Sequence, residues 1–178
     1  MVILLDTSLI VNMYYNGLMI CKCQPTDIDR IYLLINEAAK AYEGVIPADC
    51  YHQPYMPMDE LEREIKRMTF FGWEAKEGEL VGVMGFESVK DVTLIRHAYV
   101  LPQWQKQGIG SKLLNYLRGL VTASRLLVGT WADAHWAIDF YKRRGFNLLP
   151  DKDELLKTYW DIPQRQIETS VVLGMEVG

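Results

Sequence analysis

In residues 92–121, a strand-like stretch is followed directly by a glycine-containing turn and then by apolar residues at helical spacing. The stretch VTLIRHAYVL is rich in β-branched and aromatic residues, and it stops at Pro102. Apolar residues then recur at helical spacing over 109–121, and RLLVGTW at 125–131 predicts another strand. Because parallel neighbours need a crossover connection, we expect 92–129 to form one strand–helix–strand unit.

The remaining strand-like segments are joined by short turns, which favours antiparallel pairing. Residues 69–89 predict two strands joined at KEGE, and SVKD leads into the crossover strand. Closing strands are expected at 146–149 and 168–177. The chain is therefore predicted to have an α+β fold, with a mixed, mostly antiparallel sheet flanked by helices.

Three further helices are predicted by apolar periodicity and by start signals. The first spans 27–42 with Thr26 as its N-cap, the second has Asp59 as its N-cap, and the third runs over 134–144 with Asp133 as its N-cap. We expect residues 19–178 to form a single domain. Residues 1–18 are expected to form an N-terminal extension that adds an edge strand or a dimer contact, and Met1 and Met19 both stay open as the native start.

Charge and length restrict the classes of partner. The chain has 178 residues and a formal net charge of −4, which argues against a nucleic-acid partner. No apolar run approaches the ~20 residues of a membrane span, so no membrane partner is expected. We predict a cytoplasmic protein that needs no metal, and a homodimer is compatible with the extension.

The turn QKQGIG has the features of an anion site. A strand that runs into a glycine-rich turn and a helix aims unpaired backbone N–H groups at one point. Gly108 and Gly110 lack Cβ atoms, so a diphosphate can approach the backbone closely. The segment fits neither a P-loop nor a dinucleotide fingerprint, because the lysine of the first and the third glycine of the second are missing. A turn that only lets strand and helix pack is the alternative.

Two segments resemble the GNAT superfamily of N-acetyltransferases. VLPQWQKQGIGSKLL is similar to the acetyl-coenzyme A signature of that family, with Gln105, Gly108 and Gly110 at its key positions. AIDFYKRRGF, residues 137–146, resembles the A-x-x-F-Y-x-x-x-G-F segment. The similarity extends over about 19–178, and the order of the predicted elements agrees with the family's.

The resemblance implies acetyl-CoA as co-substrate. Its diphosphate would rest on the backbone N–H groups of 105–110, and its pantetheine arm would pair with the strand end at 98–100. The family often has Asn where this chain has Ala134, which puts one contact in doubt. The cofactor-binding residues that the resemblance implies are Ala98, Tyr99, Val100, Gln105, Lys106, Gln107, Gly108, Ile109, Gly110, Ser111, Ala134 and Ala137.

The resemblance also implies direct transfer of the acetyl group to a primary amine. Val100 would hold the oxyanion with its N–H, and Tyr141 would act as general acid on the departing thiolate. From the residues alone, a packing role for Tyr141 on an apolar helix face is the favoured interpretation. A catalytically weak acetyl-CoA-binding sensor is the alternative function.

The amine acceptor and the general base are not identified by the sequence. Strand alternation places His97 on the face opposite Val100, unless a bulge resets the parity. In such folds acceptor recognition falls to the first two helices with the loop between them, here within 42–62, and to the final strands. A small amine, an antibiotic, a peptide and a protein lysine all stay open.

Overall fold

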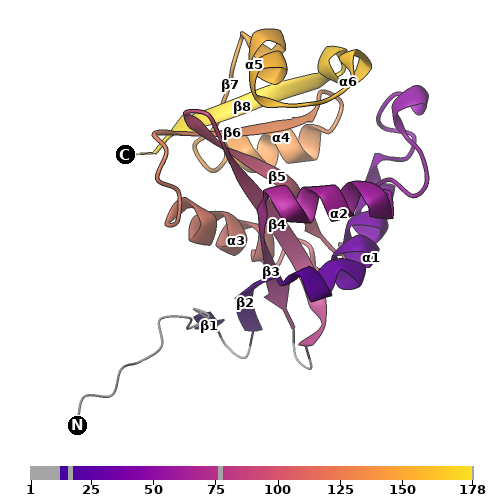
Figure 1. Cartoon of the computed structure of the whole chain (residues 1–178), viewed down its shortest axis with the longest axis vertical. Coiled ribbons are helices and arrows are strands. Elements are labelled where there is room, and N and C mark those ends of the chain that lie inside the picture. The colour runs from indigo at the N-terminus through magenta and orange to yellow at the C-terminus, as the bar shows by residue number, and fades with distance from the viewer. Residues whose placement is uncertain (1–12, 16–17, 76–77, 178) are drawn as a thin grey trace.

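The computed structural model describes residues 13–15, 18–75 and 78–177. Its strands form one sheet in the order β1-β2-β3-β4-β5-β6-β8-β7 (Figure 1). The strands are β1 (Met13–Tyr15), β2 (Leu18–Lys22), β3 (Thr69–Glu74), β4 (Leu80–Val89), β5 (Val92–Val100), β6 (Arg125–Trp131), β7 (Asn147–Leu148) and β8 (Ser170–Glu176). The helices are α1 (Ile28–Ala38), α2 (Met58–Arg67), α3 (Ile109–Arg118), α4 (His135–Lys142), α5 (Lys152–Tyr159) and α6 (Gln164–Glu168).

Within the described residues, the pairing is antiparallel everywhere except between β5 and β6. That parallel pair is the one joined through α3, as the strand–helix–strand prediction for 92–129 required. The α+β fold class and the mostly antiparallel sheet are thus confirmed. The strand predicted at 125–131 has the same bounds as β6.

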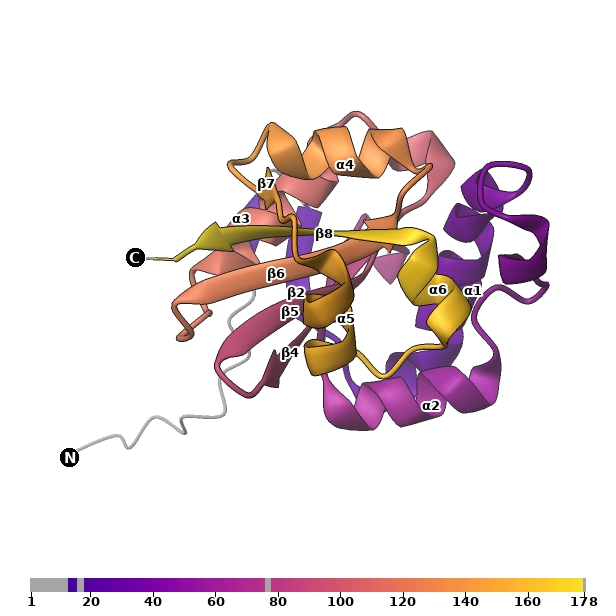
Figure 2. The ribbon, with the colours of Figure 1, turned by 90° about the horizontal axis from the view of Figure 1, so that it is seen from above.

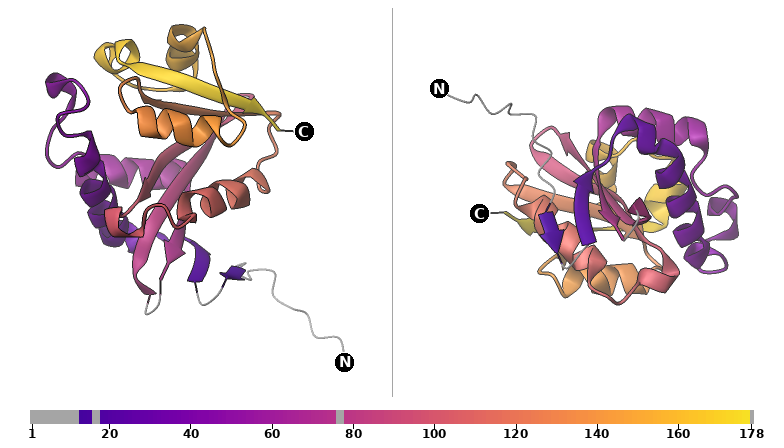
Figure 3. Two further views of the ribbon diagram at one scale, coloured as in Figure 1. Left: turned by 180° about the vertical axis from the view of Figure 1, so that it is seen from behind. Right: turned by 90° about the horizontal axis from the view of Figure 1, so that it is seen from below.

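Helices cover both faces of the sheet (Figure 2). On one face, α1 and α2 pack their apolar side chains against β3, β4 and β5. On the other face, α3 and α4 enclose the largest apolar cluster, which includes Leu113, Leu117 and Phe146. Figure 3 shows α3 and α4 in front of the sheet when the molecule is seen from behind. The short helices α5 and α6 pack on the α1 and α2 side, over β8.

Three predicted helix caps are wrong. Asp27, not Thr26, is the N-cap residue of α1, and its Oδ2 accepts from the backbone N–H of Gln24 over 2.7 Å across a short 3-10 turn. Asp59 lies inside the first turn of α2 and pairs with Arg63. Ala134, not Asp133, is the N-cap residue of α4. In each case the helix begins one or two residues away from the expected polar residue.

The predicted N-terminal extension lies partly outside the described residues. Met13–Tyr15 forms the edge strand β1, antiparallel to β2, in agreement with the edge-strand alternative. Within the described residues, no helix is long and apolar enough to cross a membrane.

Candidate functional site

The parallel pair opens into a gap where the two strands part. The pairing of β5 with β6 covers only Val92–Ile95 against Arg125–Val128. Beyond that point β5 stays paired with β4, and β6 stays paired with β8. Both strands therefore present an unpaired edge to the gap, and an extended ligand can pair with such an edge.

The backbone of Val100 faces this gap. The next N–H along the strand, that of Leu101, donates to the carbonyl of Val81 on β4 over 2.9 Å. Because successive N–H groups of a strand point to opposite edges, the N–H of Val100 points away from β4. The same alternation directs the N–H of Ala98 toward the gap.

A β-bulge in β5 lies just before these residues. Between paired positions, β5 advances from Arg96 to Tyr99 while β4 advances only from Val83 to Gly85. The extra residue is accommodated at His97, whose φ of 50° is left-handed. Arg96 and His97 consequently share the α2 face of the sheet, while Ala98 and Val100 pack toward α3. The expectation that His97 lies opposite Val100 is confirmed.

The turn before α3 carries a group of free backbone donors. Two of its residues are left-handed, Lys106 with φ of 62° and Gly108 with φ of 83°. In the part of the chain that the structure describes, the N–H groups of residues 106–111 have no hydrogen-bond acceptor. They lie in the turn before α3 and in its first turn, at the positive end of the helix dipole, which is the arrangement that binds phosphate groups.

Gly108 and Gly110 serve different purposes. Gly108 supplies the left-handed conformation, and a Cβ atom there would meet nothing within 4 Å. A Cβ atom at Gly110 would lie 3.2 Å from Cε2 of Phe140. Gly110 therefore lets the first turn of α3 pack closely against α4, in addition to the predicted approach of a diphosphate.

Arg144 brings a cation to the first turn of α3, and the sequence prediction missed it. Its Nε donates to Oγ of Ser111 over 3.1 Å, and its Nη1 donates to the carbonyl of Phe140 over 2.7 Å. Its guanidinium carbon lies 3.7 Å from the centroid of the Phe140 ring. Among the described residues no carboxylate pairs with Arg144. An arginine held in place without an anionic partner can receive a phosphate.

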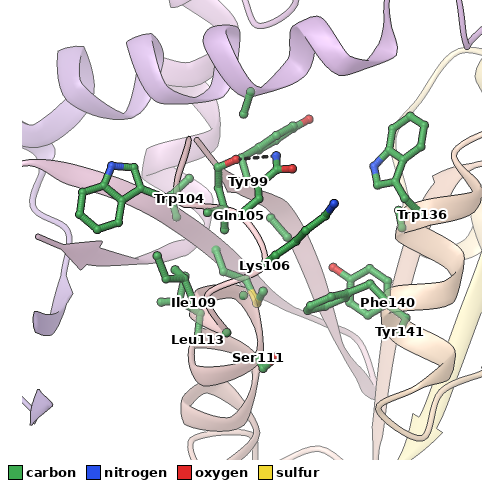
Figure 4. Close-up of a pocket in the computed structure, with 18 of the residues that line it drawn as sticks. Tyr99, Trp104, Gln105, Lys106, Ile109, Ser111, Leu113, Trp136, Phe140 and Tyr141 are labelled. Carbon is green, nitrogen blue, oxygen red and sulfur yellow. Dashed lines mark hydrogen bonds between the residues drawn. The ribbon is translucent and has the colours of Figure 1, made fainter. Parts of the chain in front are cut away.

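These groups line a cavity of about 380 Å³ between α3 and α4, with α1 at one end (Figure 4). Lys106, Arg143 and Arg144 line it, and its described lining contains no carboxylate. Of the residues implied by the family resemblance, all but Gln107 and Ala134 line this cavity. Gln107 instead donates to the carbonyl of Gln103, and Ala134 is buried beside Trp131 and Ile46.

Tyr141 is at the inner wall of the same cavity. Its ring packs edge-on against Phe140 and Phe146, at centroid distances of 5.0 and 5.3 Å. Its hydroxyl has no hydrogen-bond partner among the described residues. Burial raises the pKa of Tyr141 above its ordinary value, against the opposing effect of the Arg144 charge. Tyr141 therefore stays protonated at neutral pH.

A second cavity, of about 420 Å³, opens on the α2 side of the gap. Tyr42 and Tyr99 line both cavities and so stand between them. The lining of the second cavity is mainly anionic, whereas that of the first is cationic. Four carboxylates and two arginines line the second cavity. The carboxylates are Asp49, Glu60, Glu64 and Asp161, and the arginines are Arg96 and Arg165.

Glu64 is the buried carboxylate of the second cavity. Its Oε2 lies 3.0 Å from Nε2 of His97 and 3.3 Å from a guanidinium nitrogen of Arg96. Burial acts to raise the pKa of Glu64, but the hydrogen bond to His97 and the charges of Arg96, His97 and Arg67 bring it below its usual range. Glu64 is therefore ionised at neutral pH.

Metal ligation has no support among the described residues, where no three His, Cys, Asp or Glu side chains come together. The site is thus built of backbone donors, cations and aromatic side chains.

Solved structures share this fold over nearly the whole chain. The PaiA N-acetyltransferase of Thermoplasma acidophilum, solved with coenzyme A, superposes with a TM-score of 0.69 at 16% identity, covering 89% of this chain and 98% of that one. A GNAT-family acetyltransferase of Staphylococcus aureus gives 0.71 at 13% identity, covering 90% and 99%. These acetyltransferase structures therefore share the fold of this chain.

Residues 67–148 match the family model described as the acetyltransferase (GNAT) domain. This segment of the chain is therefore similar to GNAT acetyltransferase domains. A curated relative, the S-alkylcysteine N-acetyltransferase of Bacillus subtilis, is 40% identical over 60 residues, which are 30% of this chain and 34% of the relative. The match thus spans about a third of that relative's length.

Proposed function

We propose that this chain transfers the acetyl group of acetyl-CoA to a primary amine by direct attack. The observation that carries the proposal is the set of free N–H groups at 106–111, beside a cationic cavity and an open strand edge. A diphosphate fits the first, and a pantetheine arm fits the last. The GNAT relatives solved with coenzyme A support the same co-substrate.

The open edge of β5 would orient the thioester. Ala98 and Val100 direct their N–H groups into the gap, where pantetheine amides and the thioester carbonyl would accept. Val100 would then hold the charge that develops on the carbonyl oxygen as the amine attacks. One preorganised donor of this kind is typically worth about 3 kcal/mol in the transition state.

Tyr141 would return a proton to the sulfur of the coenzyme. Its hydroxyl is free of protein partners and lines the first cavity, and burial keeps it protonated. A phenol in this state donates to a thiolate as the carbon–sulfur bond breaks. Ser111 and Arg144, which line the same cavity, would hold the phosphate end of the coenzyme.

The amine acceptor would enter through the second cavity. Its excess of carboxylates attracts a cationic amine, and its aromatic wall of Tyr55, Trp131 and Trp160 packs against carbon chains. Tyr42 and Tyr99 mark where the two substrates would meet. We propose residues 19–178 as the catalytic domain and 1–18 as an extension to it.

A panel of amines tests this proposal. The purified chain is mixed with acetyl-CoA and, separately, S-methyl-L-cysteine, L-lysine, 1,4-diaminobutane, tyramine or a short peptide, and free thiol is followed over time. We expect at least one amine to give thiol release that depends on both chain and amine. Saturable binding of acetyl-CoA without release for any amine would contradict transfer and would favour the sensor alternative.

A further inference from the structure

We propose that His97 accepts the proton of the acceptor amine, and that Glu64 positions and stabilises it for that role. The inference rests on the proposed acetyl transfer and adds to it the base that the sequence did not identify. It follows from the bulge in β5, the contact between the two side chains and their place in the second cavity.

The bulge aims His97 at the acceptor side. With φ of 50°, His97 adopts a backbone conformation that is uncommon for residues with a side chain and is most tolerated by Asn, Asp and His. Such strain concentrates at functional sites. Its ring stacks on Phe70, with centroids 5.8 Å apart and planes 20° apart, so the imidazole has a defined orientation.

The contact with Glu64 leaves one imidazole nitrogen available. Nε2 of His97 lies 3.0 Å from the ionised carboxylate, and in the neutral ring it is therefore the protonated nitrogen that donates. Nδ1 then carries the lone pair, and no described residue donates to it. A histidine whose one nitrogen bonds a buried carboxylate while the other is free is the arrangement of a general base.

Other charged groups around His97 are already compensated. Arg96 and Arg67 both bridge Glu64 and Glu87, with nitrogen–oxygen distances of 3.1 to 3.7 Å. The positive charges of Arg96 and Arg67 thus balance the negative charges of Glu64 and Glu87. A proton accepted by His97 therefore places one further positive charge next to Glu64. Across the cavity, Glu60 and Asp161 from α2 and from the segment after α5 add negative charge, and the buried phenols Tyr55 and Tyr99 stay neutral. Apart from His97 and His52, the charged residues that line the cavity are thus four carboxylates and two arginines.

The proton balance is complete without another reagent. The ammonium form of the acceptor gives one proton to Nδ1 of His97, through water in the cavity, because His97 and Val100 are about 10 Å apart along the strand. The neutral amine forms the new carbon–nitrogen bond as the carbon–sulfur bond breaks. Tyr141 gives a proton to the sulfur and regains one from the new amide nitrogen, and His97 releases its proton to solvent.

The pH profile of kcat/KM tests the inference, using the best acceptor of the amine panel. For the unaltered chain we expect an acidic limb in addition to the limb of the amine itself near pH 10. His97→Asn retains a residue that tolerates the left-handed backbone. It should lose the acidic limb and lower kcat/KM at pH 7 by about 100-fold, with unchanged affinity for acetyl-CoA.

The Glu64→Gln variant distinguishes a role of Glu64 in positioning His97 from a role in packing alone. Removing the negative charge disfavours the imidazolium, so the limb should persist but move to lower pH. His135→Asn is the matched control, because His135 is exposed at the start of α4 and lines neither cavity. It should leave the profile unchanged.

An unaltered profile in His97→Asn would overturn the inference while leaving acetyl transfer intact. Should His97→Asn fail to fold, a fixed limb in Glu64→Gln would overturn it instead. Absence of transfer to every amine by the unaltered chain would remove the proposed function itself, and with it this role for His97.

Discussion

Arg144 donates a hydrogen bond from Nε to Oγ of Ser111 over 3.1 Å, and this contact joins the end of α4 to the first turn of α3. It fixes an arginine that has no carboxylate partner among the described residues beside the free N–H groups of 106–111. The proposed coenzyme site is therefore assembled from two segments that are separated by more than thirty residues.

Replacing Arg144 by Gln should weaken the binding of coenzyme A. Charge-assisted hydrogen bonds to phosphate contribute about 1.5–3 kcal/mol, so we expect the Kd to rise by about 10-fold or more. Calorimetric titration measures this. Arg118→Gln removes the same charge at the end of α3, outside both cavities, and should bind as the unaltered chain does. Equal Kd values for the two variants would contradict the role of Arg144.

Tyr141→Phe should lose turnover and keep coenzyme affinity. Loss of a general acid typically lowers the rate by about 100-fold or more, while the ring contacts with Phe140 and Phe146 persist. The measurement is kcat alongside the Kd for acetyl-CoA. Tyr116→Phe on α3 serves as control, since Tyr116 packs on Phe71 away from the cavity. A Tyr141→Phe variant with full turnover would leave Tyr141 as a packing residue only.

Gly108→Ala and Gly44→Ala form a matched pair. Both glycines are left-handed, with φ of 83° and 71°, and a Cβ atom at either would meet nothing within 4 Å. Each variant should therefore lose about 1–2 kcal/mol of stability from backbone strain. Only Gly108→Ala displaces the N–H groups before α3, so only it should bind coenzyme A more weakly. Equal binding by both variants would show that the turn has no part in it.

The stability contributed by Glu64 should depend on pH. Because its folded pKa is lowered, its contribution is present above the unfolded pKa of about 4.3 and is lost as pH falls through the folded value. Glu64→Gln should cost about 2 kcal/mol in the free energy of unfolding at pH 7. Urea denaturation at pH 7 and pH 3 should show this difference shrinking. For comparison, Glu37→Gln, which removes an exposed pair with Lys40, should change stability by at most about 0.5 kcal/mol at either pH.

The sequence predicted the strands and the crossover well because their signals are local. β6 lies within one apolar run, and the turn at 105–110 combines glycines with a following helical stripe. The predictions of the helix caps failed because neighbouring residues determine where each helix begins. Pro25 starts a 3-10 turn that includes Thr26, Pro57 is the N-cap residue of α2, and Ala134 is the N-cap residue of α4. A polar residue near a helix start does not by itself determine where the first turn closes.

The residues that the sequence missed are those whose position depends on distant parts of the chain. Arg144 lies at the end of the helix predicted over 134–144, and its contact with Ser111 depends on how α3 and α4 pack. His97 has its place because β4 and β5 differ by one residue over the bulge, and pairing between strands is not visible in either strand alone. In the sequence, nothing indicates the bulge except a histidine within a strand-like stretch.

The central claim is that the backbone N–H groups of 106–111 receive the diphosphate of the coenzyme. Amide ¹H–¹⁵N spectra of the labelled chain, recorded during titration with coenzyme A, test it most directly. We predict saturable shifts that are largest for residues 106–111 and for Ala98 and Val100. Binding that leaves those amides unmoved, or the absence of any saturable shift, would contradict the claim.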